Sequence, residues 1–225
     1  MIYFKSIDTC FVRVPKTGSE SLHLFLYKNF YNHSEDLISK IPEIKDYGLY
    51  DQFQLQPNEK WNFESSHVTA KELIEADLVP SSAAFIGVIR NPLERFLSLY
   101  TYYIKKGRYY TCTVPSPEHF QTLFDKGVFK TYTSYHVRPQ YEFLEYNNQT
   151  GSWWLYDNLE DHIKLFCDEH ALKIKYDLTH INKSPGNKKK LIKHFYTKEL
   201  ILDIEKMYEK DFELYDQLEK QYNVK

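Results

Sequence analysis

Residues 15–21, Pro-Lys-Thr-Gly-Ser-Glu-Ser, combine the groups that bind a phosphate or sulfate ester. Lys16 supplies a mobile positive charge, and Gly18 allows a tight turn. A helix that begins after this turn would present its first backbone N–H groups, and the positive end of its dipole, to an anion. Additional hydroxyl donors belong to Thr17, Ser19 and Ser21. The segment therefore predicts a phosphate cradle that begins at Pro15.

The same residues also fit a simpler structure. Thr17 and Glu20 are three residues apart, which is the spacing of a capping box at an ordinary helix start. The triphosphate-loop pattern GxxxxGK[ST] is absent, because here the lysine precedes the glycine. Both interpretations of the segment stay open on these residues alone.

A second group of residues that could bind an anion lies at 90–98, Arg-Asn-Pro-Leu-Glu-Arg-Phe-Leu-Ser. Arg90 ends an apolar run, and arginine suits bidentate contact with a phosphate. Ser98 lies about two helical turns later, so it can share a helix face with Arg90. Arg95, beside Glu94, is interpreted as part of a surface ion pair.

Apolar patterns predict the elements that position these residues. Thr9–Val14 and Ala83–Ile89 are β-rich or continuously apolar runs, typical of buried strands. Apolar residues at helical spacing predict a helix over Glu20–Phe30, and Pro92 suits the first turn of a helix that runs to about Lys105. Alternating strands and helices predict an α/β fold, a parallel sheet with helices on both faces. Further expected elements are strands at 61–66 and 153–156, helices at 70–76, 120–124, 159–170 and from 198, and loops at 106–119 and 178–190.

Composition excludes several classes of protein. The formal net charge of −2 argues against a general nucleic-acid binder, which needs a broad basic surface. The three cysteines form no CxxC, so neither a disulfide framework nor a zinc site is expected. No run approaches the length of a membrane span and no secretory signal is visible, so we expect a soluble, cytoplasmic protein. Aromatic residues reach 17%, which suits either an aromatic core or a groove for sugar rings or a base.

With both motifs present in this order, the chain resembles sulfotransferases that use 3′-phosphoadenosine-5′-phosphosulfate (PAPS). Residues 11–30 resemble the family's 5′-phosphosulfate loop, and RNPLERFLS resembles its 3′-phosphate motif. Arg13 just before the loop and the pair His67-Val68 look most like membrane-type carbohydrate sulfotransferases, including uronyl 2-O-sulfotransferases. The resemblance implies a P-loop-like fold, one domain over residues 1–225, and an acceptor-side insertion at 106–150. Because the anchor of that branch is missing, it also points to a bacterial or viral relative.

The resemblance implies roles for individual residues. Arg90 and Ser98 would hold the donor's 3′-phosphate, and Lys16 would stabilise the leaving phosphate without a metal. The remaining donor contacts would come from Pro15, Thr17, Gly18, Ser19, Ser21, Asn182, Lys183 and Ser184. His67 is the candidate general base, since an unperturbed imidazole titrates near neutrality, and Glu20 is its rival. On the acceptor side we expect Arg13, Arg138 and Gln140.

The predicted function is therefore transfer of a sulfuryl group from PAPS to a hydroxyl of a carbohydrate-type acceptor. PAPS is the expected donor, and 3′-phosphoadenosine-5′-phosphate (PAP) its product. Two alternatives stay open. One is a nucleotide or small-molecule kinase with an atypical phosphate loop, and the other is a non-catalytic carbohydrate-binding relative.

Overall fold

The computed structural model describes residues 1–30, 35–36, 67–105, 116–127, 134–146, 149–180 and 188–223. These residues form two compact units that alternate along the chain. The sheet unit comprises Met1–Ile89 and Tyr141–Ile181, and the helical unit comprises Arg90–Gln140 and Asn182–Lys225. The segment 106–150 contributes to both units, and its role as an acceptor-side insertion stays a prediction, as does the single domain.

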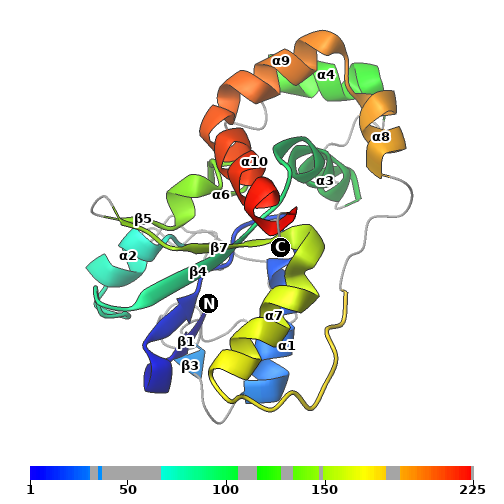
Figure 1. Ribbon diagram of the computed structural model, residues 1–225. Coiled ribbons are helices and arrows are strands. Elements are labelled where there is room, and N and C mark those ends of the chain that lie inside the picture. Colours follow the sequence, from blue (N-terminus) through cyan, green and yellow to red (C-terminus); the bar gives the residue numbers. More distant parts are fainter. Residues whose placement is uncertain are drawn as a thin grey trace. The chain divides into compact units, whose positions relative to one another are not determined.

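A five-stranded sheet in the order β3-β1-β2-β4-β7 forms the centre of the sheet unit (Figure 1). β2, β4 and β7 run parallel, whereas β1 is antiparallel to both of its neighbours. The α/β fold is confirmed, with a sheet that is mixed rather than wholly parallel. The strands are β1 (Ile2–Phe4), β2 (Thr9–Phe11), β3 (Glu35–Asp36), β4 (Ala84–Ile89) and β7 (Ser152–Leu155).

The continuous apolar run predicted as a strand becomes β4, which has a strand on either side. Ile86 of β4 lies opposite Phe11 of β2 and opposite Ser152 of β7. Apolar side chains are needed on both faces of such a strand, which explains the unbroken run. β2 is shorter than predicted, because its last residue is Phe11. The next residue, Val12, still donates its N–H to the Ile86 carbonyl at 2.8 Å, and the loop follows.

Two helices cover one face of the sheet through an aromatic core. They are α1 (Ser19–Phe30) and α7 (Leu159–Glu169). Phe11 lies at the centre of this core, with edge-to-face contacts at 5.2 Å to both Trp154 and Phe166. Such pairs contribute beyond their buried area, so many of the chain's aromatic residues are used for packing.

The opposite side of the sheet holds α2 (Ala70–Glu75) and a small hairpin of β5 (Glu145–Tyr146) and β6 (Gln149–Thr150) (Figure 1). α2 begins with a full capping box between Thr69 and Glu72. Short 3₁₀ turns complete the unit: η1 (Lys5–Ile7), η4 (Tyr141–Phe143) and η5 (Tyr156–Asn158). The predicted strand at 61–66 lies outside the described residues.

Asn29 near the end of α1 fixes the extended segment that follows α7. Its side-chain oxygen accepts from the N–H groups of Lys175 and Tyr176, at 2.7 and 2.8 Å. Its side-chain nitrogen donates to the Tyr176 carbonyl at 3.0 Å. One buried amide thus satisfies three backbone groups that have no strand neighbour.

The helical unit is built around stacked aromatic rings. Tyr100 stacks on Phe120 with ring centroids 4.2 Å apart, and Phe96 also stacks on Phe120, with centroids 5.5 Å apart. Burial raises the pKa of Tyr196 and Tyr208 well above the ordinary value, so both phenols stay protonated and donate hydrogen bonds. The helices are α3 (Pro92–Lys105), α4 (Pro117–Asp125), α6 (Ser134–Val137), α8 (Lys188–Phe195), α9 (Lys198–Met207) and α10 (Glu209–Asn223).

Two predicted loops are shorter than expected. α4 begins at Pro117 rather than near Phe120, because Ser116 accepts from the N–H of His119 and Pro117 fills the first helical position. α8 begins at Lys188, inside the loop predicted at 178–190. Within the described part of the chain, no helix is both long and apolar enough to cross a membrane.

Arg95 is buried, which corrects its interpretation as a surface ion pair with Glu94. Its guanidinium donates to the carbonyls of His136 and Arg138, each at 2.9 Å. The Val137 carbonyl between them accepts from the Tyr208 hydroxyl at 2.6 Å. Three consecutive carbonyls are therefore held by two buried side chains, and these fix the segment from 136 to 138.

We expect Arg95→Ala to lower the free energy of unfolding by about 3 kcal/mol, since two buried carbonyls lose a charged donor. Thermal denaturation should report this as a melting point lower by ~6–12 °C. Lys71→Ala is the matched control, because Lys71 forms an exposed ion pair with Glu75 and its loss should change stability by less than ~0.5 kcal/mol. Equal melting points for the two variants would contradict the role given to Arg95.

Candidate active site

The loop that follows β2 has a backbone suited to an anion. Lys16 and Gly18 adopt positive φ angles of 65° and 76°, and Thr17 between them does not. Alternation of this kind turns successive N–H groups toward one concavity. α1 begins at Ser19, and the first N–H groups of a helix have no carbonyl partner within it. The loop therefore has a backbone that suits an anion, and its binding of a phosphate stays a prediction.

Hydroxyl groups hold this loop in place. Thr17 and Ser19 both donate to the Val14 carbonyl, at 2.9 and 2.8 Å, and both side chains are buried. The Thr17 hydroxyl thus donates to the Val14 carbonyl, rather than forming the predicted capping box with Glu20. The first hydrogen bond of the helix is donated by the Leu22 N–H to the Gly18 carbonyl. The backbone N–H groups and the half-buried Lys16 are consequently the groups best placed for an anion, rather than these two hydroxyls.

Tyr156, which follows β7, packs against the loop at Gly18. A Cβ added to Gly18 would lie 2.7 Å from Cε2 of the Tyr156 ring. Glycine is therefore needed at this position both for its positive φ and for the close approach of the ring. Sequence reasoning missed Tyr156, because no spacing in the chain relates it to the loop.

His67 is fixed beside the loop by a backbone carbonyl. Its Nδ1 lies 2.8 Å from the Arg13 carbonyl oxygen. A carbonyl only accepts hydrogen bonds, so Nδ1 bears the proton, and in the neutral imidazole Nε2 has the lone pair. This is the tautomer that a general base needs. The bond to Arg13 thus orients the imidazole of His67, and the predicted catalytic role of His67 stays a proposal.

Three other predicted residues lie close to this loop in sequence. Glu20 is half-buried in the first turn of α1, where the helix dipole favours a carboxylate. Arg13 is buried two residues after the end of β2, and its backbone carbonyl contacts His67. Ser21 is also buried in the first turn of α1. The proposed pairing of Arg13 with an acidic acceptor stays a prediction.

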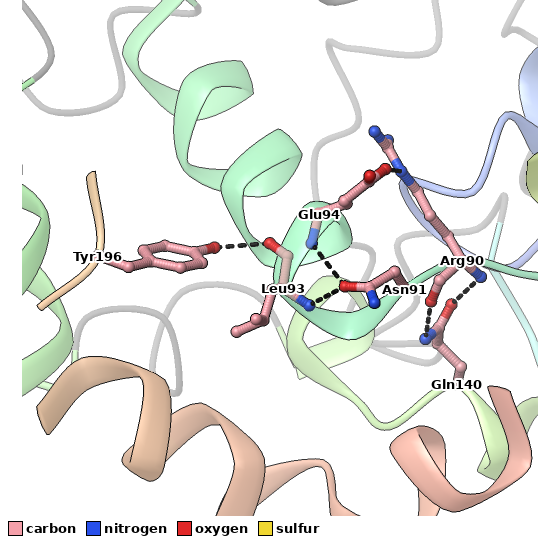
Figure 2. Close-up of polar contacts among 6 residues, drawn as sticks. All are labelled: Arg90, Asn91, Leu93, Glu94, Gln140 and Tyr196. Atoms are coloured by element: carbon pink, nitrogen blue, oxygen red, sulfur yellow. Dashed lines mark hydrogen bonds and ion pairs between the residues drawn. The ribbon is translucent and has the colours of Figure 1, made fainter. Parts of the chain in front are cut away.

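The second motif begins the helical unit, directly after β4. Asn91 caps α3: its side-chain oxygen accepts from the N–H groups of Leu93 and Glu94, at 3.1 and 3.4 Å (Figure 2). Pro92 then occupies the first helical position. The capping residue Asn91 therefore lies between Arg90, which follows β4, and the first residue of α3.

Glu94 orients the Arg90 side chain. Arg90 Nε lies 3.2 Å from a Glu94 carboxylate oxygen, with both side chains largely buried (Figure 2). Glu94 and Ser98 are one turn apart on α3 and so share a face. Arg90 therefore contacts the helix face to which half-buried Ser98 belongs, and the joint role of Arg90 and Ser98 stays a prediction.

Gln140 and Arg138, both predicted on the acceptor side, lie in the same unit. Gln140 is wholly buried, and its amide is bonded to the backbone of Arg90. This contradicts its predicted contact with an acceptor, because neither end of the amide is exposed. Arg138 is half-buried, and its carbonyl is bonded to Arg95. Asn182, Lys183 and Ser184 lie outside the described residues.

Comparison with known protein families shows the family to which the chain belongs. The sequence model of the sulfotransferase family matches residues 2–217. The chain belongs to the sulfotransferase family. No significant match is found among curated proteins or solved structures. Within the described residues of this sulfotransferase, no three His, Cys, Asp or Glu side chains gather as metal ligands.

We expect Gly18→Ala to weaken binding of a 5′-phosphorylated nucleotide by the sulfotransferase at least ~10-fold, because the new methyl group displaces the Tyr156 ring and strains a positive φ. Isothermal titration with PAP measures the effect. Gly127→Ala is the matched control: Gly127 also has a positive φ, but nothing lies within 4 Å of its added Cβ. Similar losses in both variants would mean that Tyr156 does not support the loop.

Proposed function

We propose that this sulfotransferase moves a sulfuryl group from PAPS to a hydroxyl of a carbohydrate-type acceptor. The observation that supports the proposal most directly is the loop from Pro15 to Ser19, with its alternating φ angles, its lysine and the start of α1. In a member of this family, such a loop suits the 5′-phosphosulfate of the donor.

The two ends of the donor are assigned to two groups of residues. The backbone N–H groups of the loop and Lys16 hold the 5′-phosphosulfate. Arg90 and Ser98 hold the 3′-phosphate, which ATP lacks, so they select PAPS. The orientation of Arg90 by Glu94 supports this assignment, because the planar guanidinium of an oriented arginine suits charge-assisted bonds to a phosphate. Asn182–Ser184 remain proposed additional contacts to the nucleotide.

The reaction breaks one bond and forms one. The acceptor oxygen attacks the sulfur, and the bond from sulfur to the bridging oxygen breaks in line with the attack. His67 Nε2 takes the proton of the acceptor hydroxyl, since Nδ1 is bonded to the Arg13 carbonyl. Lys16 and the loop N–H groups stabilise the negative charge that develops on the leaving PAP. Positioning and electrostatics supply the catalysis, as in phosphoryl transfer.

Support for a carbohydrate acceptor comes from the likeness of Arg13, the loop and His67-Val68 to carbohydrate sulfotransferases. Arg138 remains a proposed acceptor contact, and Arg13 a proposed partner for an acidic sugar. Glu20 remains the alternative base.

PAP should stabilise the protein more than ADP with Mg²⁺ does. At ~100 times its dissociation constant a ligand contributes ~2.7 kcal/mol, which raises the melting point of a chain of this size by roughly 5–10 °C. A thermal-shift comparison tests this. A larger shift with ADP and Mg²⁺ would favour the kinase, and PAP binding without turnover in the acceptor screen below would favour the non-catalytic relative.

The base is tested by transfer rates at saturating donor. We expect His67→Ala to lower kcat ~10²–10⁴-fold, as for loss of a general base, while PAP affinity stays unchanged. Glu20→Gln is the matched variant and should retain most of kcat. An unimpaired His67→Ala would remove His67 from the mechanism, and a large loss in Glu20→Gln alone would make Glu20 the base.

The acceptor is tested by incubating the protein with PAPS and a panel of oligosaccharides, glycolipids and small alcohols. We expect mass spectrometry to detect an added sulfo group on saccharides, including those with uronic acid. Sulfation confined to non-sugar alcohols would contradict the acceptor class while leaving the donor assignment intact.

A further inference from the structure

The backbone of Arg90 is held by a single buried side chain. The side-chain oxygen of Gln140 accepts from the Arg90 N–H at 3.0 Å, and its side-chain nitrogen donates to the Arg90 carbonyl at 2.9 Å (Figure 2). One amide therefore satisfies both backbone groups of Arg90, as a neighbouring strand would. The ladder between β4 and β7 has ended one residue earlier, at Ile89.

Gln140 is in turn held by a carboxylate from the last described helix. Asp211, in the first turn of α10, accepts from the Gln140 backbone N–H at 2.7 Å. Both side chains are fully buried, with 0% exposed. A buried carboxylate is costly unless it is well bonded, so a strong interaction of Asp211 with its partners is needed for this arrangement. The segment before Gln140 is fixed independently, by Arg95 and Tyr208.

Arg90 is thus constrained at two points, at its backbone by Gln140 and at its Nε by Glu94. A free arginine side chain has ~2 kcal/mol of rotamer entropy, which binding must otherwise remove. Side chains fixed before binding contribute more of their interaction energy to affinity. The position of the guanidinium therefore depends on a chain of contacts from Asp211 through Gln140 to Arg90.

We infer that Gln140 and Asp211 are positioning residues that set the affinity of Arg90 for the donor's 3′-phosphate. The inference rests on the proposed function. It reassigns Gln140 from the acceptor to the donor, and it gives α10 a part in donor recognition. Neither residue touches the nucleotide, and both act through Arg90.

The test compares PAP with adenosine 5′-monophosphate (AMP), which lacks the 3′-phosphate. Gln140→Met keeps the length of the side chain but removes both bonds to the Arg90 backbone. We expect it to weaken PAP binding ~10-fold, as the loss of two buried hydrogen bonds and of a fixed arginine suggests. AMP binding should change less than ~2-fold. A merely structural role would weaken both ligands alike, and that result would overturn the inference.

A second pair of variants serves if Gln140→Met does not fold. Asp211→Asn keeps an acceptor oxygen for the Gln140 N–H and should retain the preference for PAP, whereas Asp211→Ala removes the acceptor and should lose it. Equal preference in these two variants would overturn the inference.

A double-mutant cycle separates this inference from the proposed function. Gln140→Met should have no further effect on PAP affinity in an Arg90→Ala background, because the contact it supports is gone. If the wild type does not prefer PAP to AMP, the proposed donor is wrong and the inference falls with it. If the preference exists and is lost in Arg90→Ala but kept in Gln140→Met, the donor assignment stands and the role of Gln140 is wrong.

Discussion

The parallel pairing of β2 with β4 is the constraint on which the candidate site depends. In a parallel pair the carboxyl ends of both strands open at the same edge of the sheet, where α/β folds bind ligands. The anion loop continues from β2, and Arg90 is the residue that follows β4. The register that places Phe11 opposite Ile86 therefore determines where both motifs begin along the sheet.

Short-range signals made the strands and helix starts of this arrangement predictable. The run from Ala83 to Ile89 identified β4, and Pro92 marked the start of α3, because apolar continuity and the fit of proline to a first helical turn depend on neighbouring residues. Contacts across long stretches of sequence gave no such signal. Gln140 is separated by 50 residues from Arg90 and by 71 from Asp211, and nothing in their local sequence shows that they meet. Arg95 was misread for the same reason, since its partners lie more than 40 residues away.

Side chains, rather than further strands or helix turns, satisfy the backbone where regular structure stops. Val14 has the hydroxyls of Thr17 and Ser19, Arg90 has the amide of Gln140, and the segment after α7 has Asn29. Each of these backbone positions lies at or near the end of an element, where an unbonded polar group would be costly. Aromatic side chains fill the cores of both units, whereas these buried polar side chains bond the backbone at the ends of helices and strands.

The bond between Asp211 and Gln140 also bears on the order in which the protein becomes competent during synthesis. The ribosome makes the loop after β2 early, and the two residues that contact this region, His67 and Tyr156, follow well before α10. Arg90 is present by then, but the carboxylate that secures its support is not. In the proposed site, the residues assigned to the 5′ end of the nucleotide are thus made before the support of the arginine assigned to its 3′-phosphate. Under the proposed donor assignment, recognition of both phosphates therefore requires the last described helix, which is made after all the other parts of the site.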